Sequence, residues 1–257
     1  YLCHPSMANN ELSGPLVLNQ LVNKIKNKKN LKFSYRFVIT SETIGSIAYL
    51  KKRGEYLKKN LIAGYQITCV GDNGIFNYKK TKNEGSLSDF LAIKTLRDKK
   101  KKFNILDFQP TGSDERQYSS PGYDLPIGSL MRTPYDKFIE YHTSLDNKEF
   151  INIEKLLDTV EAYYEIIKLN EKNCYYISNF PYGEPMLGKR KLYGDLSAYN
   201  ALNSELDRLT NNIFWILSLS KRKKSYLEIL EKSKSNKKTF DKSIQILLKK
   251  KLIREAN

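Results

Sequence analysis

Short β-rich runs alternate with helical patterns along the first part of the chain. The run LKFSYRFVIT (31–40) alternates apolar and polar residues as a strand does, and residues 43–53 follow with the spacing of a helix. Further strands are predicted at 60–71, 74–78, 103–108 and 124–131, and further amphipathic helices at 86–100 and 151–169. Such alternation predicts an α/β domain in which helices flank a mixed sheet.

The pattern changes in the last third of the chain. Turn residues and aromatics are frequent at 179–209, which we interpret as a linker or an ordered excursion. The final stretch reads as three short helices followed by a strand, an order typical of a winged helix-turn-helix domain. We therefore predict an α/β domain over 1–178, the linker over 179–209 and a winged helix over 210–257.

The chain carries 44 Lys and Arg against 28 Asp and Glu, a formal net charge of +16. An excess of this size is compatible with a nucleic acid or another anionic surface as partner. The interpretation we favour is a Lys-rich, solvated surface that reflects an AT-biased genome. Composition alone leaves both interpretations open.

The three cysteines, Cys3, Cys69 and Cys174, lie far apart and form no CxxC spacing. This distribution argues against a disulfide framework and against a thiolate zinc site, so we expect buried thiols in a reducing compartment. No apolar run approaches the roughly 20 residues that cross a bilayer, and nothing reads as a signal peptide. We expect a cytoplasmic protein without a membrane partner.

The chain contains only two histidines, His4 and His142, and both fall in loops expected at the carboxyl ends of strands. Imidazole is the commonest neutral ligand of zinc. Asp146, four residues after His142, could orient that imidazole. Other candidate oxygen ligands or bases are Asn10, Glu11, Glu42, Asp72, Asp114 and Glu115. Spacing alone does not choose among them.

Five motifs occur in a specific order: CHPSMANNELSG, ETIGSIAYL, GSDERQYSSPGYDLP, EYHTSLD and GEPMLGKRKLY. With them the chain resembles a bacterial aminopeptidase-like family of zinc-exopeptidase fold with a C-terminal winged helix (DUF4910 and DUF2172 types). It is more distantly similar to the M28 aminopeptidases. Members of the family begin with a further N-terminal stretch, so we expect this chain, which starts at Tyr1 without Met, to be the later part of a longer protein.

The resemblance implies a metal site at His4, Asn10 and His142, with Glu42 as general base. Three positions depart from the pattern of the wider group. Asn10 replaces a bridging Asp, Ser41 precedes Glu42 where an acidic pair is expected, and Thr68 occupies the place of the second metal's Asp. Two neighbouring cations need an anionic bridge, so we expect one zinc ion, or none. Glu42 could instead cap the helix that follows it.

The motif GSDERQ contributes Asp114, Glu115 and Arg116, and Arg132 follows a predicted strand. The resemblance favours these residues as contacts to a substrate's amino terminus and carboxylate. A surface cluster of ion pairs is the alternative.

We therefore expect a zinc-dependent, aminopeptidase-like hydrolase that cleaves an amide bond of a small peptide or aminoacyl compound. Two alternatives remain open: an amidohydrolase of an N-acylated sugar or surface-glycan precursor, and a metal-free pseudoenzyme or DNA-associated regulator that acts through the winged helix. The third helix of that domain ends in consecutive lysines, but Gln245 is its sole amide for reading bases. We favour a packing role, such as homo-oligomer formation, over nucleic-acid binding.

Overall fold

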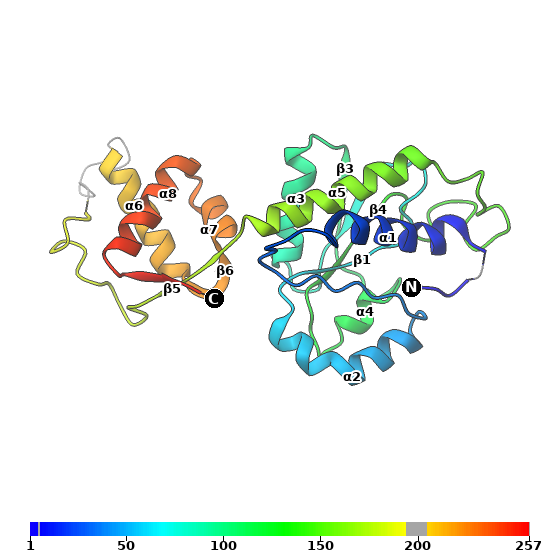
Figure 1. Ribbon diagram of the computed structural model, residues 1–257, viewed down its shortest axis with the longest axis horizontal. Coiled ribbons are helices and arrows are strands. Elements are labelled where there is room, and N and C mark those ends of the chain that lie inside the picture. Colours follow the sequence, from blue (N-terminus) through cyan, green and yellow to red (C-terminus); the bar gives the residue numbers. More distant parts are fainter. Residues whose placement is uncertain (5, 194–204, 257) are drawn as a thin grey trace. The chain divides into compact units, whose positions relative to one another are not determined.

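The computed structural model describes residues 1–4, 6–193 and 205–256, and the chain divides into two compact units. The first unit is Tyr1–Glu171 and the second is Lys172–Asn257 (Figure 1). Among the described residues, no helix combines the length and the apolar character needed to cross a membrane.

A four-stranded mixed sheet forms the centre of the first unit. Its strands are β1 (Gly64–Gln66), β2 (Phe76–Lys79), β3 (Phe103–Leu106) and β4 (Ile127–Met131), in the order β1-β4-β2-β3. β1 runs parallel to β4 and β2 runs parallel to β3, whereas β2 and β4 are antiparallel. Every residue of β2 and β4 is buried, as expected for strands covered on both faces. The predicted mixed α/β sheet is confirmed.

Helices cover both faces of this sheet, with α1, α3 and α5 on one side and α2 and α4 on the other (Figure 1). A short π-helix, Ala8–Leu12, leads directly into α1. The helices are α1 (Ser13–Ile25), α2 (Ile44–Asn60), α3 (Leu87–Asp98), α4 (Glu115–Tyr118) and α5 (Ile153–Glu171). At the start of α3, Ser86 and Asp89 form a reciprocal capping box, which explains why the helix begins there.

The strand predicted at 31–40 is wrong: none of these residues is in a strand, and the segment is not part of the sheet. An isolated bridge joins Leu2 to Ser41, directly after the segment. The strand predicted at 60–71 is likewise reduced to β1. Strand composition is present in both segments, but a strand exists only where a neighbour supplies hydrogen bonds.

The second unit packs three helices against a three-stranded antiparallel sheet. Helices α6 (Glu205–Leu219), α7 (Tyr226–Ser233) and α8 (Lys237–Lys249) match the prediction of three helices. The sheet has the order β6-β5-β7 and consists of β6 (Lys221–Ser225), β5 (Tyr175–Ser178) and β7 (Ile253–Glu255). The order of its helices and strands agrees with the predicted winged helix-turn-helix architecture.

Two predicted boundaries need correction. The α/β domain was expected to extend to residue 178, but β5 pairs with β6 and β7 and therefore belongs to the second unit. The stretch 179–209 is not a separate linker, since residues 179–193 and the start of α6 also belong to that unit. Residues 194–204 of that stretch lie outside the described part of the chain.

Candidate metal centre

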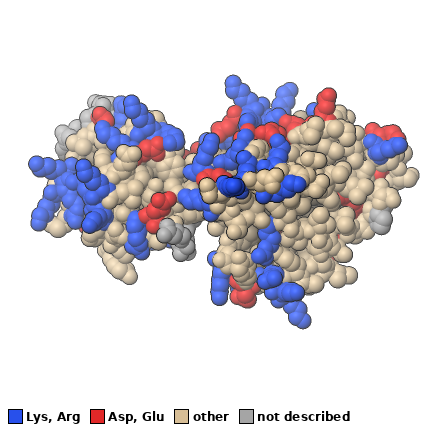
Figure 2. Space-filling model, viewed as in Figure 1, with Lys and Arg blue, Asp and Glu red and all other residues tan. Residues whose placement is uncertain are grey.

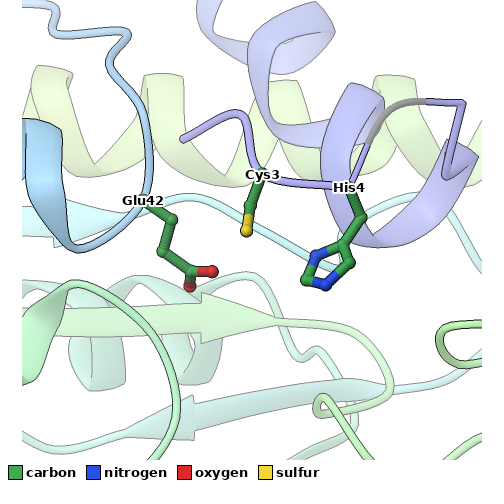
Figure 3. Close-up of side chains that lie close together, drawn as sticks. All are labelled: Cys3, His4 and Glu42. Atoms are coloured by element: carbon green, nitrogen blue, oxygen red, sulfur yellow. The ribbon is translucent and has the colours of Figure 1, made fainter.

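The first residues of the chain meet the loop before α2 at one edge of the sheet. The N–H of Leu2 donates to the carbonyl of Thr40 over 2.9 Å, and the N–H of Glu42 donates to the carbonyl of Leu2 over 3.4 Å. This pairing places the side chains of Cys3, His4 and Glu42 side by side (Figure 3). A sulfur, a ring nitrogen and a carboxylate oxygen of the three residues lie within 4.8 Å of one another. We call these residues the donor group.

Glu11 holds the imidazole of His4. Its Oε1 lies 3.3 Å from Nδ1 of His4, and its Oε2 accepts the N–H of Cys3 over 2.7 Å. Glu11 is only 3% exposed, so its carboxylate is fixed behind the donor group. A carboxylate on one ring nitrogen is the usual way to present the other nitrogen to a metal. The sequence offered Glu11 only as a possible ligand, and its orienting position was not predicted.

Ser113 and Asp114 fix the loop that carries Glu42. The hydroxyl of Ser113 donates to Oε1 of Glu42 over 2.7 Å. Asp114 accepts the N–H of Thr43 and the hydroxyl of Ser46, both over 2.8 Å, and so stabilises the start of α2. Burial raises the pKa of Asp114, although these hydrogen bonds act in the opposite direction. Asp114 therefore has the capping role that was considered for Glu42. The carboxylate of Glu42 lies near Cys3 and His4 instead.

His142 lies beside the donor group without joining it. Its ring stacks on Tyr141 at 3.8 Å between centroids and lies tilted against His4 at 3.9 Å. Among the described residues, the group whose ligand atoms all converge within 4.8 Å contains Cys3, His4 and Glu42 only. Desolvation, followed by the neighbouring His4, lowers the pKa of His142, so this imidazole is neutral at pH 7. The structure thus brings the two histidines together, as predicted from their positions in loops.

The side chain of Asn10 lies in a buried polar network. Its Oδ1 accepts the hydroxyl of Tyr1 over 3.1 Å and lies 3.7 Å from the thiol sulfur of Cys69. Its amide nitrogen donates to Glu11 over 3.1 Å. Thr68 completes the network by donating to the hydroxyl of Tyr1. Neutral hydrogen-bonding groups therefore occupy the positions where the resemblance implied metal-binding carboxylates.

Asp146 orients the opening loop instead of the His142 ring. Its carboxylate accepts the N–H of Asn9 over 2.6 Å and the N–H of Asn10 over 3.0 Å. No hydrogen bond joins Asp146 to His142 within the described part of the chain. The predicted contact is therefore corrected: two backbone donors satisfy this carboxylate, which is 1% exposed. Asp72 is buried in the same way and accepts from Asn9, Gly74 and Thr133.

Glu115 does not face a substrate site. It is 1% exposed and forms an ion pair of 2.7 Å with the equally buried Lys79. The hydroxyl of Tyr135 also donates to Glu115, over 2.8 Å. Arg116, the next residue, is exposed and is the only one of the four predicted substrate contacts that a solute can reach.

Arg132 is a structural residue at the end of β4. Its guanidinium is 2% exposed, lies 2.7 Å from Asp158 and donates to the carbonyls of Gly74 and Lys155. It also lies over the ring of Phe76, 4.4 Å from the centroid. Because all these partners are internal, Arg132 cannot bind a substrate anion, and that prediction is wrong. Asp114 and Glu115 are corrected for the same reason.

Cys3 and His4 of the donor group fit a single dication such as zinc, and Glu42 lies close enough to serve as a base beside it. A thiolate and an imidazole are established zinc ligands, and a catalytic zinc site keeps one position for water or substrate. Desolvation, followed by a hydrogen bond to the Glu42 carboxylate, raises the pKa of the Cys3 thiol to about 11, so a metal ion would have to displace the thiol proton on binding. Cys3 was not predicted as a ligand, because only paired cysteines were considered for a zinc site. The sequence feature that indicates Cys3 is its position next to His4.

Comparison with known proteins assigns the family. The description "Domain of unknown function (DUF4910)" matches residues 1–173. The chain belongs to this family. A winged helix-turn-helix description matches residues 174–255, directly after the DUF4910 part, in agreement with the structural division.

Two relatives from Clostridium acetobutylicum match almost the whole chain. A Clostridium acetobutylicum protein named for polysaccharide biosynthesis and an aminopeptidase-like domain is 43% identical over 91% of this chain and 52% of its own length. A crystal structure named as a peptidase from the same species is 38% identical, with a TM-score of 0.69 over 99% of this chain and 57% of its own. The chain thus spans about half the length of these relatives.

A zinc aminopeptidase from Bacillus subtilis shares the fold at 14% identity, with a TM-score of 0.50 over 63% of this chain and 42% of its own. The aminopeptidase-like fold that the motifs implied is therefore confirmed. At this identity, the likeness concerns the fold alone.

Proposed function

We propose that the first unit is the catalytic part of a metal-dependent hydrolase that cleaves an amide bond in a small peptide or aminoacyl compound. The observation that carries this proposal is the convergence of Cys3, His4 and Glu42. The shared fold with a zinc aminopeptidase, and the aminopeptidase-like domain named in the Clostridium relative, support the same reaction class.

Cys3 and His4 would hold one zinc ion, with Cys3 in the place that the resemblance gave to Asn10. His142, whose ring centroid lies 3.9 Å from that of His4, would be the third ligand. When bound, zinc supplies Lewis-acid polarisation of the scissile carbonyl. Glu11 holds Nδ1 of His4, which leaves Nε2 as the nitrogen that would hold the ion.

Glu42 is the proposed general base. One of its oxygens accepts the Ser113 hydroxyl, which holds the carboxylate in place and leaves the second oxygen to take a proton from water. The same carboxyl group can then give that proton to the departing amine. Positioning of this kind matters because a displacement of about 1 Å can cost roughly a hundredfold in rate.

The variant Glu42→Gln tests the assignment. As a base, Glu42 is dispensable for metal binding, so the variant should retain zinc in a calorimetric titration but lose hydrolysis of aminoacyl p-nitroanilides. The matched control is Glu55→Gln, on the exposed face of α2. Loss of zinc together with activity would assign Glu42 as a ligand, and unchanged activity would reject the proposal.

A second substrate class follows from the name of the Clostridium relative, which refers to polysaccharide biosynthesis. On this alternative the same donor group removes the acyl group of an N-acylated sugar in a surface-glycan precursor. Parallel assays with N-acetylated amino sugars and aminoacyl p-nitroanilides distinguish the two. Turnover of only the sugars, lost in Glu42→Gln, would favour the alternative.

For the winged helix we propose an interaction role, such as homo-oligomer formation. Lys and Arg are frequent on its visible face (Figure 2). However, two lysines of α8 are neutralised by ion pairs, Lys237 with Asp241 and Lys242 with Glu205. DNA binding by this domain would be steeply weakened between 50 and 200 mM salt in an anisotropy titration. Sedimentation that shows a dimer, together with no salt-dependent DNA binding, would support the interaction role.

A further inference from the structure

The ammonium group of Lys79 joins three segments of the first unit at the end of β2. Its Nζ lies 2.6 Å from the carbonyl oxygen of Thr111, 2.7 Å from Oε1 of Glu115 and 2.8 Å from the hydroxyl of Tyr135. The side chains of Lys79 and Glu115 are 5% and 1% exposed, so these bonds form away from water. Thr111 lies in the loop after β3, Glu115 begins α4, and Tyr135 lies in the segment that follows β4. We call Lys79, Glu115 and Tyr135 the clamp.

The clamp is closely packed, and the glycine at residue 112 is part of its geometry. Gly112 has a φ of +107°, and a Cβ at this position would lie 2.2 Å from the hydroxyl oxygen of Tyr135. The rings of Phe108 and Tyr135 lie beside the ammonium of Lys79, with their centroids 5.7 and 5.4 Å from Nζ. The hydroxyl of Tyr135 also donates to Oε1 of Glu115, over 2.8 Å. Each member of the clamp therefore binds both of the others.

One side of the clamp holds the residues that fix Glu42. Lys79 binds the carbonyl of Thr111 and the carboxylate of Glu115, which lie four positions apart in the sequence. Between these two residues, Ser113 donates its hydroxyl hydrogen to the carboxylate of Glu42. One ammonium group thus fixes both ends of the short stretch from which Glu42 receives its hydrogen bond.

The other side of the clamp holds the segment that carries His142. Residues 132–152 contain no helix or strand, so side-chain bonds decide where this segment lies. The clamp holds its start through Tyr135, and Asp146 holds its later part through two backbone N–H groups of the opening loop. Between these two anchors, the ring centroid of His142 lies 3.9 Å from that of His4.

We propose that the clamp is a positioning device, which fixes Glu42 and His142 relative to each other although none of its members belongs to the donor group. This inference rests on the proposed function, in which Glu42 is the base and His142 a ligand. The two residues lie on loops that are 100 positions apart in the sequence, and one buried ammonium is bonded to the supports of both. Because an error of about 1 Å in such a site can cost roughly a hundredfold in rate, a rigid link between the loops raises kcat without touching substrate.

The variant Tyr135→Phe tests the inference, because it removes one hydroxyl and keeps the buried ion pair. Its matched control is Tyr78→Phe, which removes another hydroxyl at the same strand, one that donates to Asp89 of α3 over 2.9 Å. Both variants should lower the urea midpoint by a similar amount, since each loses one hydroxyl and its hydrogen bonds. An effect of lost stability alone would therefore appear in both.

For Tyr135→Phe we expect kcat and zinc affinity to fall at least about fivefold at unchanged KM, the size of effect that one lost hydrogen bond produces. The amides of Thr43, Tyr141 and Thr143 are hydrogen-bonded in the two loops, and their hydrogen exchange should be at least about fivefold faster. Tyr78→Phe should keep all of these quantities within about twofold of wild type, because Tyr78 shares no partner with the clamp.

Wild-type kcat, zinc affinity and exchange in Tyr135→Phe would overturn the inference. Equal changes in Tyr135→Phe and Tyr78→Phe would also overturn it, because they would indicate a general loss of stability. If wild type neither binds zinc nor hydrolyses aminoacyl p-nitroanilides, the proposed function fails, and the exchange rates alone decide whether the clamp fixes the two loops. Faster exchange in Tyr135→Phe only would then support the clamp, and equal exchange in all three proteins would overturn it.

Discussion

The hydroxyl of Ser113 lies 2.7 Å from Oε1 of Glu42 and joins two loops that are 71 residues apart in the sequence. The bond holds one oxygen of the Glu42 carboxylate in place. Removing it with Ser113→Ala should cost about 1 kcal/mol of positioning, or roughly five- to tenfold in kcat, because the carboxylate is then free to rotate. Zinc affinity should stay unchanged.

Steady-state kinetics and a zinc titration of Ser113→Ala check this prediction. Ser41→Ala is the matched control, since Ser41 precedes Glu42 and is exposed. Rescue of kcat by Ser113→Thr, which keeps the hydroxyl, would support positioning through the hydrogen bond. Equal kcat in Ser113→Ala and wild type would exclude it.

Asp114 should make stability depend on pH in a defined direction. Burial raises its pKa above the ordinary value of 3.8, so the folded state holds the proton more tightly than the unfolded state does. Its contribution to stability is complete below that ordinary value and is lost as the pH rises through the folded pKa. The variant Asp114→Asn, which has no charge to lose, should show a smaller decrease between about pH 4 and pH 7.

Urea unfolding at the two pH values measures this difference against wild type. Asp124 provides the opposite control, because hydrogen bonds from Asn83 and Lys82 lower its pKa. Asp124→Asn should therefore remove stability that wild type gains as the pH rises. The same pH dependence in Asp114→Asn and wild type would show that Asp114 does not titrate differently on folding.

The ion pair of Lys79 and Glu115 should stabilise the fold by less than the free energy of unfolding that is lost when either residue stays buried without its partner. Both are buried, and Oε2 of Glu115 has no hydrogen-bond partner among the described residues, so the pair is imperfectly satisfied. Lys79→Met leaves a buried carboxylate and should cost about 3 to 5 kcal/mol in the free energy of unfolding. Adding Glu115→Leu should recover much of that loss.

A double-mutant cycle by urea unfolding tests this coupling. Lys80→Met, at the residue that follows β2, is the control, because the partners of Lys80, Glu84 and Asp107, are exposed. It should cost less than about 1 kcal/mol. Additive losses in the Lys79 and Glu115 double variant would contradict the account.

Arg132 should matter for stability and not for substrate binding. Its partners, Asp158 and two carbonyl groups, lie inside the first unit. Arg132→Met should lower the free energy of unfolding by about 3 kcal/mol or more, while the folded variant keeps the wild-type KM. A variant of wild-type stability with a raised KM would restore the role predicted from the sequence.

The periodicity of the sequence was sufficient for most of the fold. The capping Ser86 and the apolar spacing at 151–169 are local signals, and both helices occur where they were predicted. The segment 31–40 shows the limit. Its alternation predicts a strand, but whether it pairs depends on a neighbour elsewhere in the chain.

The candidate site was predictable in part for the same reason. The meeting of His4 with His142 followed from their positions in loops, and the approach of Glu42 was implied by the family resemblance. The roles of Cys3, Glu11 and Ser113 depend on side-chain directions that no spacing reveals. Arg132 and Glu115 were misassigned because a charged residue in a sequence does not show whether its partner is solvent or a buried ion.

The central claim is that Cys3 and His4 hold one metal ion, and a calorimetric zinc titration of the purified chain tests it most directly. We predict one zinc ion per chain, with affinity at least about tenfold lower in Cys3→Ser and in His4→Ala, because each change removes a ligand. Cys174→Ser, a thiol in the second unit, is the control and should bind as wild type does. Equal zinc affinity in wild type, Cys3→Ser and His4→Ala, or no zinc binding by wild type, would contradict the account.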